Sequence, residues 1–394
     1  MNQAASTPPF SGDLASLLWP ASTVSFFDAC WQRQPLHVPH SDPDYFTGLF
    51  SVDDIDDLLR FSVPLEAGKL SLGIKGVPVP DEELWDDETP GFNYERIRSF
   101  CSAVSLTLNY LQQDNVRVRW MAERLQRDFA GRLRQSVNVN AYLTPGRSWL
   151  GLHRDTHDEI NLQVLGSKRW RIYEPDIRVP VPEMPISTRP PSTLPAPCME
   201  VNLRQGEVLY VPRGFWHDPV NAEEGPSLGL TIGLTSMTWS DVLVSAVRLA
   251  AASSAGLRES VPLGAASDAS ASAWQLCDGL TGWAAMSAAR EAIQQGLAGD
   301  GLGEMAFTAW PPLGADSRLR PVRPSTWRVD ANGGLIRLDV AGLRIGLRRE
   351  LREALDAIRR RDEFTPSQLA ATLNDSERLR FCRLLQRFGA VESA

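Results

Sequence analysis

Residues 151–173 read GLHRDTHDEINLQVLGSKRWRIY, and residues 209–219 read LYVPRGFWHDP. The two stretches hold His153, Asp155 and His217. In an extended strand, residues i and i+2 point to the same side, so His153 and Asp155 can reach one ion while a strand folded alongside brings His217. Two imidazoles and one carboxylate that leave coordination positions open are typical of non-haem Fe(II) enzymes that activate oxygen. We therefore predict one metal site at these three residues.

The residues around the metal motif alternate between apolar and polar side chains, which is typical of strands. Five such runs lie between residues 136 and 234: SVNVNAYL, EINLQVL, KRWRIY, EVLYVP and SLGLTIGL. Short strands broken by turns indicate an antiparallel barrel or jelly roll. Residues 179–197 hold seven prolines, so we expect an irregular loop there.

Outside this region the apolar spacing is mostly helical. It predicts helix at 12–34, at 52–60, in two segments of 94–135, and again between 236 and 300. After a proline-rich joint at 311–324, two strands and three helices predict a small α+β unit. Those helices are expected at 349–360, 365–373 and 376–388. The resulting division is into three domains, at 1–235, 236–312 and 313–394.

The composition is that of a globular protein, with 43% hydrophobic and 22% charged residues in 394. No apolar run approaches the roughly 18 residues that span a membrane. The N-terminal sequence has no basic region followed by an apolar core, so we expect no secretion signal. The five cysteines are scattered and never form C-x-x-C. This pattern predicts reduced thiols in the cytoplasm rather than a disulfide framework or a zinc site.

Charge is distributed unevenly along the chain, whose net charge is −8. Residues 313–394 contain sixteen arginines and eleven acids, a net charge of +5, so the first 312 residues carry −13. The bulk of the protein should therefore not attract nucleic acid, and only the C-terminal part could do so.

The strand alternation also indicates what lines the barrel. Asn138, Asn140 and Tyr142 share one face of their strand, and Lys168 is one of only three lysines in the chain. A buried ammonium beside a tyrosine hydroxyl suits a ligand that carries a carboxylate, because a buried charge needs a partner. A solvated strand lysine is the alternative, and strand polarity alone leaves both readings open.

These motifs together resemble a JmjC-type cupin, and more closely the ribosomal oxygenase branch of the Fe(II)/2-oxoglutarate dioxygenases. The resemblance rests on NAYLTPG, WLGLHRDTHDEINLQVLGSKRWRIYEP, GEVLYVPRGFWHDP and GLTIGL, and it extends over roughly residues 15–235. It implies a mainly β fold with flanking helices, built on a double-stranded β-helix (cupin or jelly-roll) core. A helical dimerisation region and a winged-helix-like α+β domain are expected to follow, and hence a homodimer through 236–312.

The resemblance also implies roles for individual residues. The metal ligands of the family match His153, Asp155 and His217, which would hold Fe(II). The basic residue that pairs with the C5 carboxylate of 2-oxoglutarate falls on Lys168. The neighbouring Asn and Tyr match Asn140 and Tyr142. One departure is Gly233, which stands where relatives tend to have a serine; Thr231 lies two residues earlier on the same face and is expected to supply the hydroxyl.

The expected reaction is hydroxylation of a side-chain carbon in a peptide or protein, with release of succinate and CO2. Acidic Asp158, Glu159 and Asp218 next to the ligands favour a basic or neutral peptide such as an arginine- or histidine-bearing segment of a ribosomal protein. The Trp149 turn and the proline-rich loop are expected to wall its groove. His157 lies four residues after His153, roughly 13 Å along a strand, so we expect it at the mouth rather than at the ion.

Other functions remain open from the sequence. Within the enzyme class, the alternatives are tailoring of a peptide natural product and oxidation of a small molecule. Outside it, they are a non-catalytic JmjC-like binding protein and a DNA-binding regulator that uses the C-terminal domain.

Overall fold

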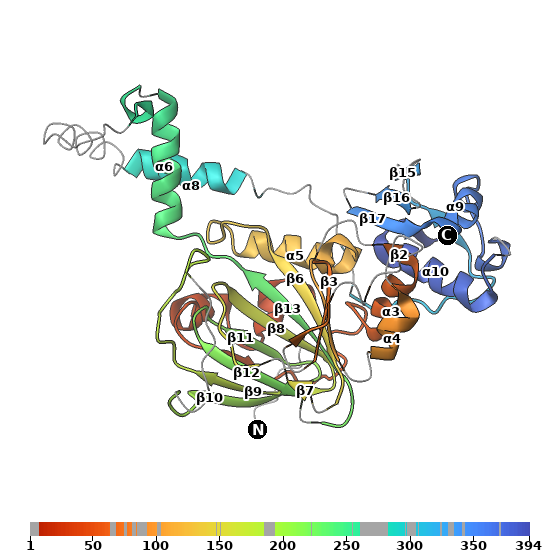
Figure 1. Ribbon diagram of the computed structural model, residues 1–394, viewed down its shortest axis with the longest axis horizontal. Coiled ribbons are helices and arrows are strands. Elements are labelled where there is room, and N and C mark those ends of the chain that lie inside the picture. The colour runs from red at the N-terminus through yellow and green to blue at the C-terminus, as the bar shows by residue number, and fades with distance from the viewer. Residues whose placement is uncertain are drawn as a thin grey trace, which may run out of the picture.

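In the computed structural model, the chain forms a β-barrel, a projecting pair of helices and a C-terminal unit (Figure 1). The structure describes residues 8–63, 68–74, 77–80, 84, 93–100, 104–146, 148–149, 151–184, 194–221, 223–253, 255–260, 283–295, 297, 305, 307–323, 325–329, 335–340, 343–369 and 372–394.

Two antiparallel sheets make the barrel. The larger has the order β1-β11-β8-β13-β6-β5-β3-β4, and the smaller has the order β10-β9-β12-β7. The strands of the larger sheet are β1 (Leu36–Val38), β3 (Leu70–Ile74), β4 (Val77–Pro78), β5 (Ser105–Leu108), β6 (Asn138–Thr144), β8 (Asp158–Leu165), β11 (Val208–Val211) and β13 (Ser227–Leu234). Those of the smaller sheet are β7 (Ser148–Trp149), β9 (Ser167–Tyr173), β10 (Met199–Arg204) and β12 (Trp216–Asn221). The mainly β, cupin-like core that we predicted is confirmed, and so are the five alternating runs.

The register of β13 positions the polar residues inside the barrel. β13 lies between β8 and β6, with Thr231 opposite both Asn161 and Asn140, and Gly233 opposite Glu159. On the outer side, Val139 and Ala141 of β6 are buried in the core cluster that also holds Val118 and Met121 of helix α5 (Val116–Asp128). Strand alternation thus separates an apolar outer layer from a polar interior.

The N-terminal segment packs short helices against the larger sheet. They are α1 (Leu14–Leu18), α2 (Thr23–Ser25) and the π-helix η1 (Phe26–Cys30). Two further short helices follow later in the chain, α4 (Tyr94–Phe100) and the 3-10 helix η3 (Leu111–Gln113). Phe26 packs edge-on against Tyr210 of β11, with 4.9 Å between ring centroids. This aromatic contact joins the N-terminal segment to the larger sheet.

The C-terminal unit includes a piece of the N-terminal part of the chain. Its elements are β14 (Leu319–Pro321), β15 (Ser325–Val329), β16 (Leu335–Val340), β17 (Leu343–Arg348), η6 (Arg349–Leu351), α9 (Arg352–Arg359), η7 (Pro366–Gln368), α10 (Asp375–Phe388) and β18 (Val391–Ser393). Strand β2 (Ser62–Val63) pairs with β17, and helix α3 (Val52–Phe61) packs on α10. Asp57 of α3 is fully buried and binds Arg380 and Arg383 of α10, each at 2.7 Å.

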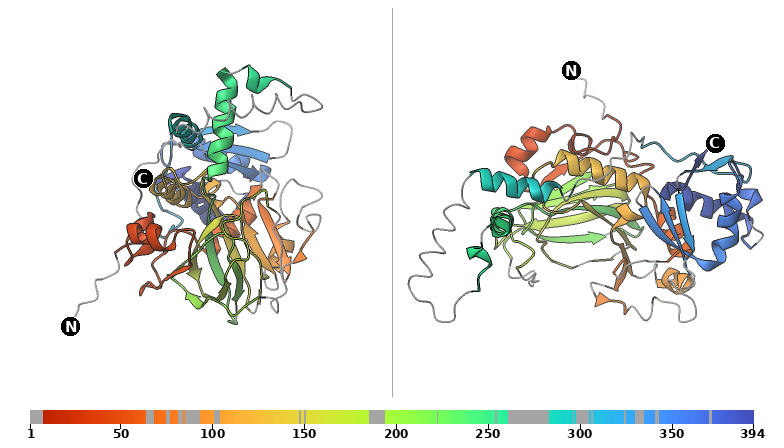
Figure 2. Two further views of the ribbon diagram at one scale, coloured as in Figure 1. Left: turned by 90° about the vertical axis from the view of Figure 1, so that its left-hand side faces the viewer. Right: turned by 90° about the horizontal axis from the view of Figure 1, so that it is seen from above.

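A helical arm leaves the barrel after β13 (Figures 1 and 2). It consists of α6 (Trp239–Ser253), η5 (Gly256–Arg258) and α8 (Trp283–Gln295). Val242 and Ala246 of α6 are buried against Ala289 of α8. None of the helices among the described residues has both the length and the apolar character that a bilayer crossing requires.

Two secondary-structure predictions are wrong. Residues 105–108, expected to be helical, form β5, because β3 and β6 flank this segment and satisfy its backbone groups. Of the helix expected at 365–373, the described part holds only the turn η7, which the capping box of Thr365 and Gln368 closes. The three domain boundaries stay a prediction.

Candidate metal centre

The two sequence stretches that carry the metal motif are joined through their backbones. His153 N–H donates to the carbonyl of His217 at 3.1 Å, and His217 N–H donates back to His153 at 2.8 Å. Gly214 N–H donates to the carbonyl of Asp155 at 2.9 Å. His217 lies on β12, and these three hydrogen bonds hold the irregular segment around His153 and Asp155 against it.

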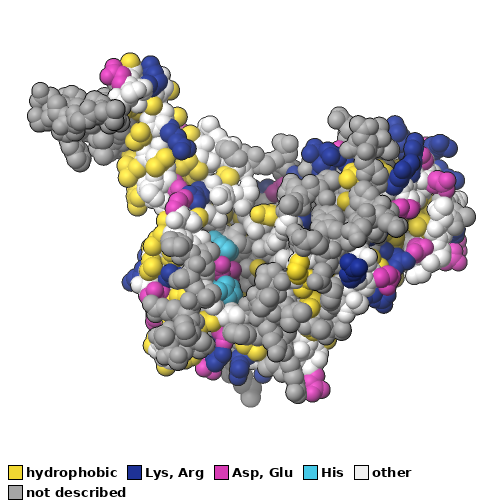
Figure 3. Space-filling view, in the orientation of Figure 1, with side chains coloured by type: hydrophobic (Ala, Val, Ile, Leu, Met, Phe, Trp, Pro, Cys, Tyr) yellow, Lys and Arg dark blue, Asp and Glu magenta, His cyan; other side chains and the backbone are white. Residues whose placement is uncertain are grey.

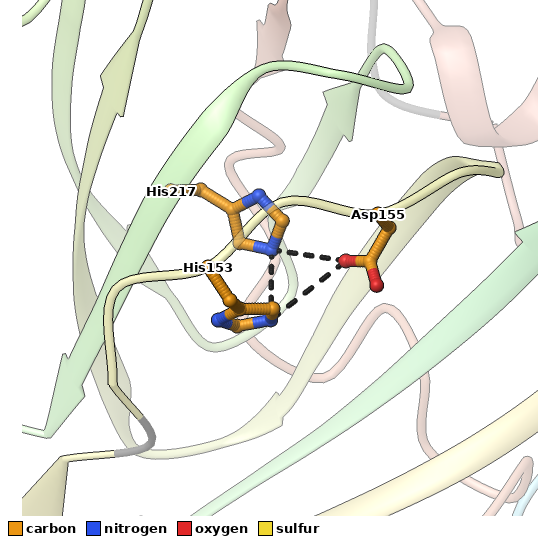
Figure 4. Close-up of side chains that lie close together, drawn as sticks. All are labelled: His153, Asp155 and His217. Carbon is orange, nitrogen blue, oxygen red and sulfur yellow. Dashed lines mark hydrogen bonds and ion pairs between the residues drawn. The ribbon is translucent and has the colours of Figure 1, made fainter. Parts of the chain in front are cut away.

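The three side chains point their donor atoms at one another (Figure 4). His217 Nε2 lies 3.1 Å from His153 Nε2 and 3.3 Å from Asp155 Oδ2, and the third separation is 3.7 Å. A circle through three atoms so spaced has a radius of about 2.0 Å, close to the roughly 2.0–2.2 Å at which imidazole nitrogen and carboxylate oxygen bind a divalent metal. The spacing therefore fits one ion.

The remaining ring nitrogens fix the tautomers of both histidines. His153 Nδ1–H donates to the carbonyl of Gly151 at 2.8 Å, and His217 Nδ1–H donates to the carbonyl of Phe215 at 3.1 Å. Each Nε2 then turns a lone pair towards the other, which is repulsive unless a cation lies between them. Asp155 Oδ2 is buried and accepts no hydrogen bond from the described residues. Two imidazoles and one carboxylate arranged in this way suit Fe(II) and leave coordination positions open.

Burial and mutual contact set the charge of the group. Burial alone would raise the pKa of Asp155, but the nearby imidazoles of His217, His157 and His153 hold that pKa well below its usual range. Burial opposes the charged form of His217, yet the contacts with Asp155 and Glu159 raise its pKa to about 9. A positive charge is thus favoured at the centre of the triad even before a metal binds.

A cavity opens from the triad into the barrel, and Lys168 lies in it. The cavity is lined by His153, His217, Tyr142, Glu159, Asn161, Gln163, Lys168, Trp170 and Thr231, among others. Lys168 is 4% exposed, and its Nζ lies 5.9 Å from the ring centroid of Tyr142. Burial lowers its pKa to about 8. Within the described residues it has neither a carboxylate partner nor a hydrogen bond, so the solvated alternative is wrong and the ammonium lacks an anion.

The other predicted cosubstrate residues differ in their placement. Burial raises the pKa of Tyr142 well above its usual value, so its hydroxyl stays a hydrogen-bond donor. Thr231 lines the cavity, and its hydroxyl donates to Asn161 Oδ1 at 2.7 Å. Asn140 neighbours Tyr142 but does not line the cavity, and its Oδ1 accepts from Tyr110 N–H. Their roles stay predictions.

His157 lies closer to the triad than its sequence spacing suggested. The chain turns after Asp155, so donor atoms of Asp155, His157 and Glu159 all lie within 4.8 Å of one another. A Cβ added to Gly233 would lie 3.2 Å from His157 Cδ2. The histidine ring therefore occupies the space that a serine at position 233 would need.

Two of the three acidic residues expected to attract a basic substrate have other roles. Asp158 is fully buried and accepts hydrogen bonds from Tyr210 and Ser236, each at 2.8 Å. Asp218 is buried and forms an ion pair with Arg171. Only Glu159 faces the cavity, so the charge argument for a basic substrate loses most of its support.

The polar face of β8 was missed as part of the site. Glu159, Asn161 and Gln163 alternate along the strand and line the cavity. The alternation in EINLQVL was the signal that could have shown it. The Trp149 side chain and residues 185–193 of the proline-rich loop lie outside the described residues, so the predicted groove walls stay predictions.

Comparison with known proteins identifies the barrel. Residues 112–242 match the JmjC domain family. Human ribosomal oxygenase 1 is 31% identical over 244 residues, which cover 59% of this chain and 36% of the relative. A protein of Dictyostelium discoideum named bifunctional lysine-specific demethylase and histidyl-hydroxylase NO66 is 27% identical over 237 residues, which cover 59% of this chain and 45% of the relative. The chain thus matches less than half of the length of either relative.

Among solved structures, the ribosomal oxygenase YcfD of Escherichia coli, in complex with cobalt and 2-oxoglutarate, aligns with a TM-score of 0.45 at 15% identity. The alignment covers 94% of this chain and 97% of that one. The resemblance to JmjC ribosomal oxygenases that the sequence motifs indicated is confirmed by the domain match and the curated relatives.

Proposed function

Residues 112–242 match the JmjC domain family, and from that premise we propose that this protein is an Fe(II)- and 2-oxoglutarate-dependent oxygenase that hydroxylates a side-chain carbon of a peptide or protein. One observation carries the proposal: a two-histidine, one-carboxylate triad with converging donor atoms opens into a cavity that holds a buried lysine without an anion. The triad would hold iron, and Lys168 would bind the far carboxylate of the cosubstrate.

Each residue of the site has a task in this proposal. Bound iron and 2-oxoglutarate supply the oxidising chemistry, with succinate and CO2 as products of the cosubstrate. In this proposal Lys168 neutralises the C5 carboxylate and Tyr142 donates its hydroxyl to it. Thr231 would have to turn its hydroxyl away from Asn161 Oδ1, to which it now donates at 2.7 Å, to do the same. The buried side chains of Trp170 and Leu203 line the same cavity, and in this proposal they exclude water from the space between the metal and Lys168.

A ribosomal protein is the substrate that we favour. The support is the similarity to proteins named ribosomal oxygenase 1, together with Glu159, the acidic residue that faces the cavity. Demethylation of methyl-lysine is the second candidate, because relatives named NO66 carry both activities in their names.

The test of the substrate class is mass spectrometry. The purified protein, with Fe(II) and 2-oxoglutarate, is incubated with a library of basic ribosomal-protein peptides and, separately, with methyl-lysine peptides. We expect a gain of one oxygen on a ribosomal peptide, and none with His153→Ala. Loss of methyl groups instead would favour the demethylase, and oxidation of free small molecules alone would contradict a protein substrate.

The lowered pKa of Lys168 predicts how cosubstrate use depends on pH. Below about 8 the free protein carries an ammonium in the cavity, and above it the amine is neutral and binds a carboxylate poorly. We expect kcat/KM for 2-oxoglutarate to fall as the pH rises through about 8. Lys168→Arg, which stays charged, should move this decline to higher pH. A profile unchanged by the substitution would mean that another group controls it.

We further propose that α6 and α8 form a homodimer interface. Trp239, Leu243 and Val247 follow one another at four-residue spacing along α6 and are 73%, 42% and 42% exposed. Neighbouring Val244 and Leu249 are also exposed, so the arm carries an apolar surface (Figure 3). Apolar surface of this extent on a projecting helix is usually covered by a partner, and a second copy would bring the matching stripe.

Substitution of the stripe tests the dimer. Light scattering at micromolar concentration should give twice the chain mass of 43.5 kDa for the native protein. Leu243→Glu combined with Val247→Glu should give the single chain mass, because burying two carboxylates in an apolar interface is costly. Val24→Glu, at a valine that is 69% exposed on α2, is the matched control and should leave the dimer intact. A monomeric native protein would refute the proposal.

The remaining assignments are proposals of the same kind. They are a JmjC domain at 1–235, a dimerisation region at 236–312, a winged-helix-like domain at 313–394 and a cytoplasmic location. The C-terminal unit combines α9 and α10 with two small sheets, an arrangement compatible with a winged-helix-like domain.

A further inference from the structure

A lateral groove of about 770 Å³ lies between the barrel and the C-terminal unit. One wall is formed by α5, η3 and the residues just before β6, and the other by α3, β2 and β17 (Figure 1). The groove shares no lining residue with the cavity at the triad. Pockets of roughly 300–1,000 Å³ commonly hold small molecules, so the lateral groove is large enough for a ligand of its own.

The apolar part of the lateral groove is aliphatic, and both walls contribute to it. The buried side chains that form this floor include Leu59, Val63, Leu108, Val137, Leu343 and Ile345. None of the described residues that line the groove is aromatic, so it offers no ring on which a nucleotide base or another flat ligand could stack. The floor therefore suits a flexible aliphatic chain.

The polar part of the lateral groove presents free hydrogen-bond donors. Gln112 Oε1 accepts from the backbone N–H of Val139 at 3.0 Å, and Gln126 Oε1 accepts from that of Val137 at 2.9 Å. These contacts fix the orientation of both amides, because a backbone N–H needs an acceptor. Each NH₂ group is left without a partner among the described residues, so a ligand that binds here should bring acceptors.

The charge of the lateral groove points to an anion. Five basic and two acidic residues line it. Both acids are already paired, Asp114 with Lys69 at 2.6 Å and Glu123 with Arg119 at 2.8 Å. Arg127, near the end of α5, is exposed and has neither an ion pair nor a hydrogen bond with the described residues. The lining carboxylates thus leave positive charge that a negatively charged ligand can neutralise.

We propose that the lateral groove binds a small molecule that has an aliphatic chain and a carboxylate, in the manner of a fatty acid. The chain lies on the aliphatic floor, and the carboxylate accepts hydrogen bonds from Arg127 and from the free amide groups of the two glutamines. Such a ligand contacts the barrel and the C-terminal unit together. The proposal is independent of the oxygenase activity, because the two sites share no residue.

The test is titration calorimetry of the full chain with two probes that carry the same chain and opposite charges. They are dodecanoate and dodecyltrimethylammonium, each kept below the concentration at which it forms micelles. We expect saturable binding of one dodecanoate per chain and much weaker binding of the ammonium. The absence of saturable dodecanoate binding, or equal affinity for the two probes, would overturn the proposal.

Arg127→Glu assigns the binding to the lateral groove. It should weaken dodecanoate binding by roughly fivefold or more, since a repulsion replaces an attraction at an exposed charge, and it should strengthen binding of the ammonium. A mere loss of structure would not produce these opposite changes. The control is Arg359→Glu, at an exposed arginine of α9 that lies outside the groove and has no ion pair among the described residues. Both affinities should stay unchanged in it.

Two further variants distinguish other places where dodecanoate could bind. Lys168→Ala removes the cation of the cavity at the triad, and Leu243→Glu combined with Val247→Glu places charge on the apolar stripe of α6. Neither change should affect dodecanoate binding. If either one abolishes it while Arg127→Glu binds dodecanoate as the native protein does, the ligand lies elsewhere and the proposal is wrong.

Discussion

His217→Ala is expected to abolish iron-dependent conversion of 2-oxoglutarate to succinate. His217 is the most buried member of the triad, with a side chain 2% exposed, and its Nε2 is the atom closest to both other ligands. Loss of an outer partner of a metal ligand typically costs 10–100-fold, so removal of the ligand itself should reduce turnover by at least ~100-fold. Succinate release at saturating Fe(II) measures the effect.

The matched control is His37→Ala. His37 lies on the edge strand β1 and contacts Glu207, away from the cavity. Its removal should leave turnover within about twofold of the native protein, since changes away from a site usually have small effects. Undiminished succinate release by His217→Ala would contradict the metal assignment.

Lys168→Ala is expected to raise the KM for 2-oxoglutarate by roughly tenfold or more, because a hydrogen bond to a charged group contributes about 1.5–3 kcal/mol. The lysine is 4% exposed, and burial lowers its pKa. Among the described residues no carboxylate pairs with it. Initial rates over a range of 2-oxoglutarate concentrations give the KM.

Arg169→Ala tests whether the rise in the KM for 2-oxoglutarate is specific to a side chain inside the cavity. Arg169 follows Lys168 on β9 and is exposed, so its side chain points out of the barrel. Its removal should leave the KM unchanged. Equal KM values for Lys168→Ala and the native protein, or a rise only in Arg169→Ala, would show that Lys168 does not bind the cosubstrate.

The sequence predicted a barrel because five of its strands, β6, β8, β9, β11 and β13, each carry their own alternation. The segment SLGLTIGL needed no knowledge of its neighbours to be recognised as β13. The strand at 105–108 could not be recognised in this way, since SLTL is short and its identity depends on pairing with β3 and β6. Contacts between distant segments overrode local propensity there.

The site was predicted in part for a similar reason. His153, Asp155 and His217 follow from motif spacing, and the structure brings their donor atoms together. His157 was placed too far away because the estimate assumed an extended chain, whereas the backbone turns after Asp155. The burial of Asp158 depends on Tyr210 and Ser236, which lie more than fifty residues away along the chain. Such partners are invisible in a local sequence pattern.

The attachment of α3 to the C-terminal unit was also beyond the sequence. Residues 52–60 were predicted only to be a helix, whereas the structure buries Asp57 fully and pairs it with Arg380 and Arg383. Charged residues are rarely buried unless they are paired, and the pairing here spans most of the chain.

The central claim is that the triad holds iron and Lys168 binds 2-oxoglutarate, so that the protein catalyses an oxidation that depends on both. The most direct measurement follows 2-oxoglutarate under isotopically labelled oxygen gas, with the purified protein, Fe(II) and ribosomal-protein peptides. The account predicts succinate that carries one labelled oxygen for each 2-oxoglutarate consumed, and no succinate when iron is withheld. Unchanged 2-oxoglutarate in the complete mixture, or succinate without the label, would contradict it.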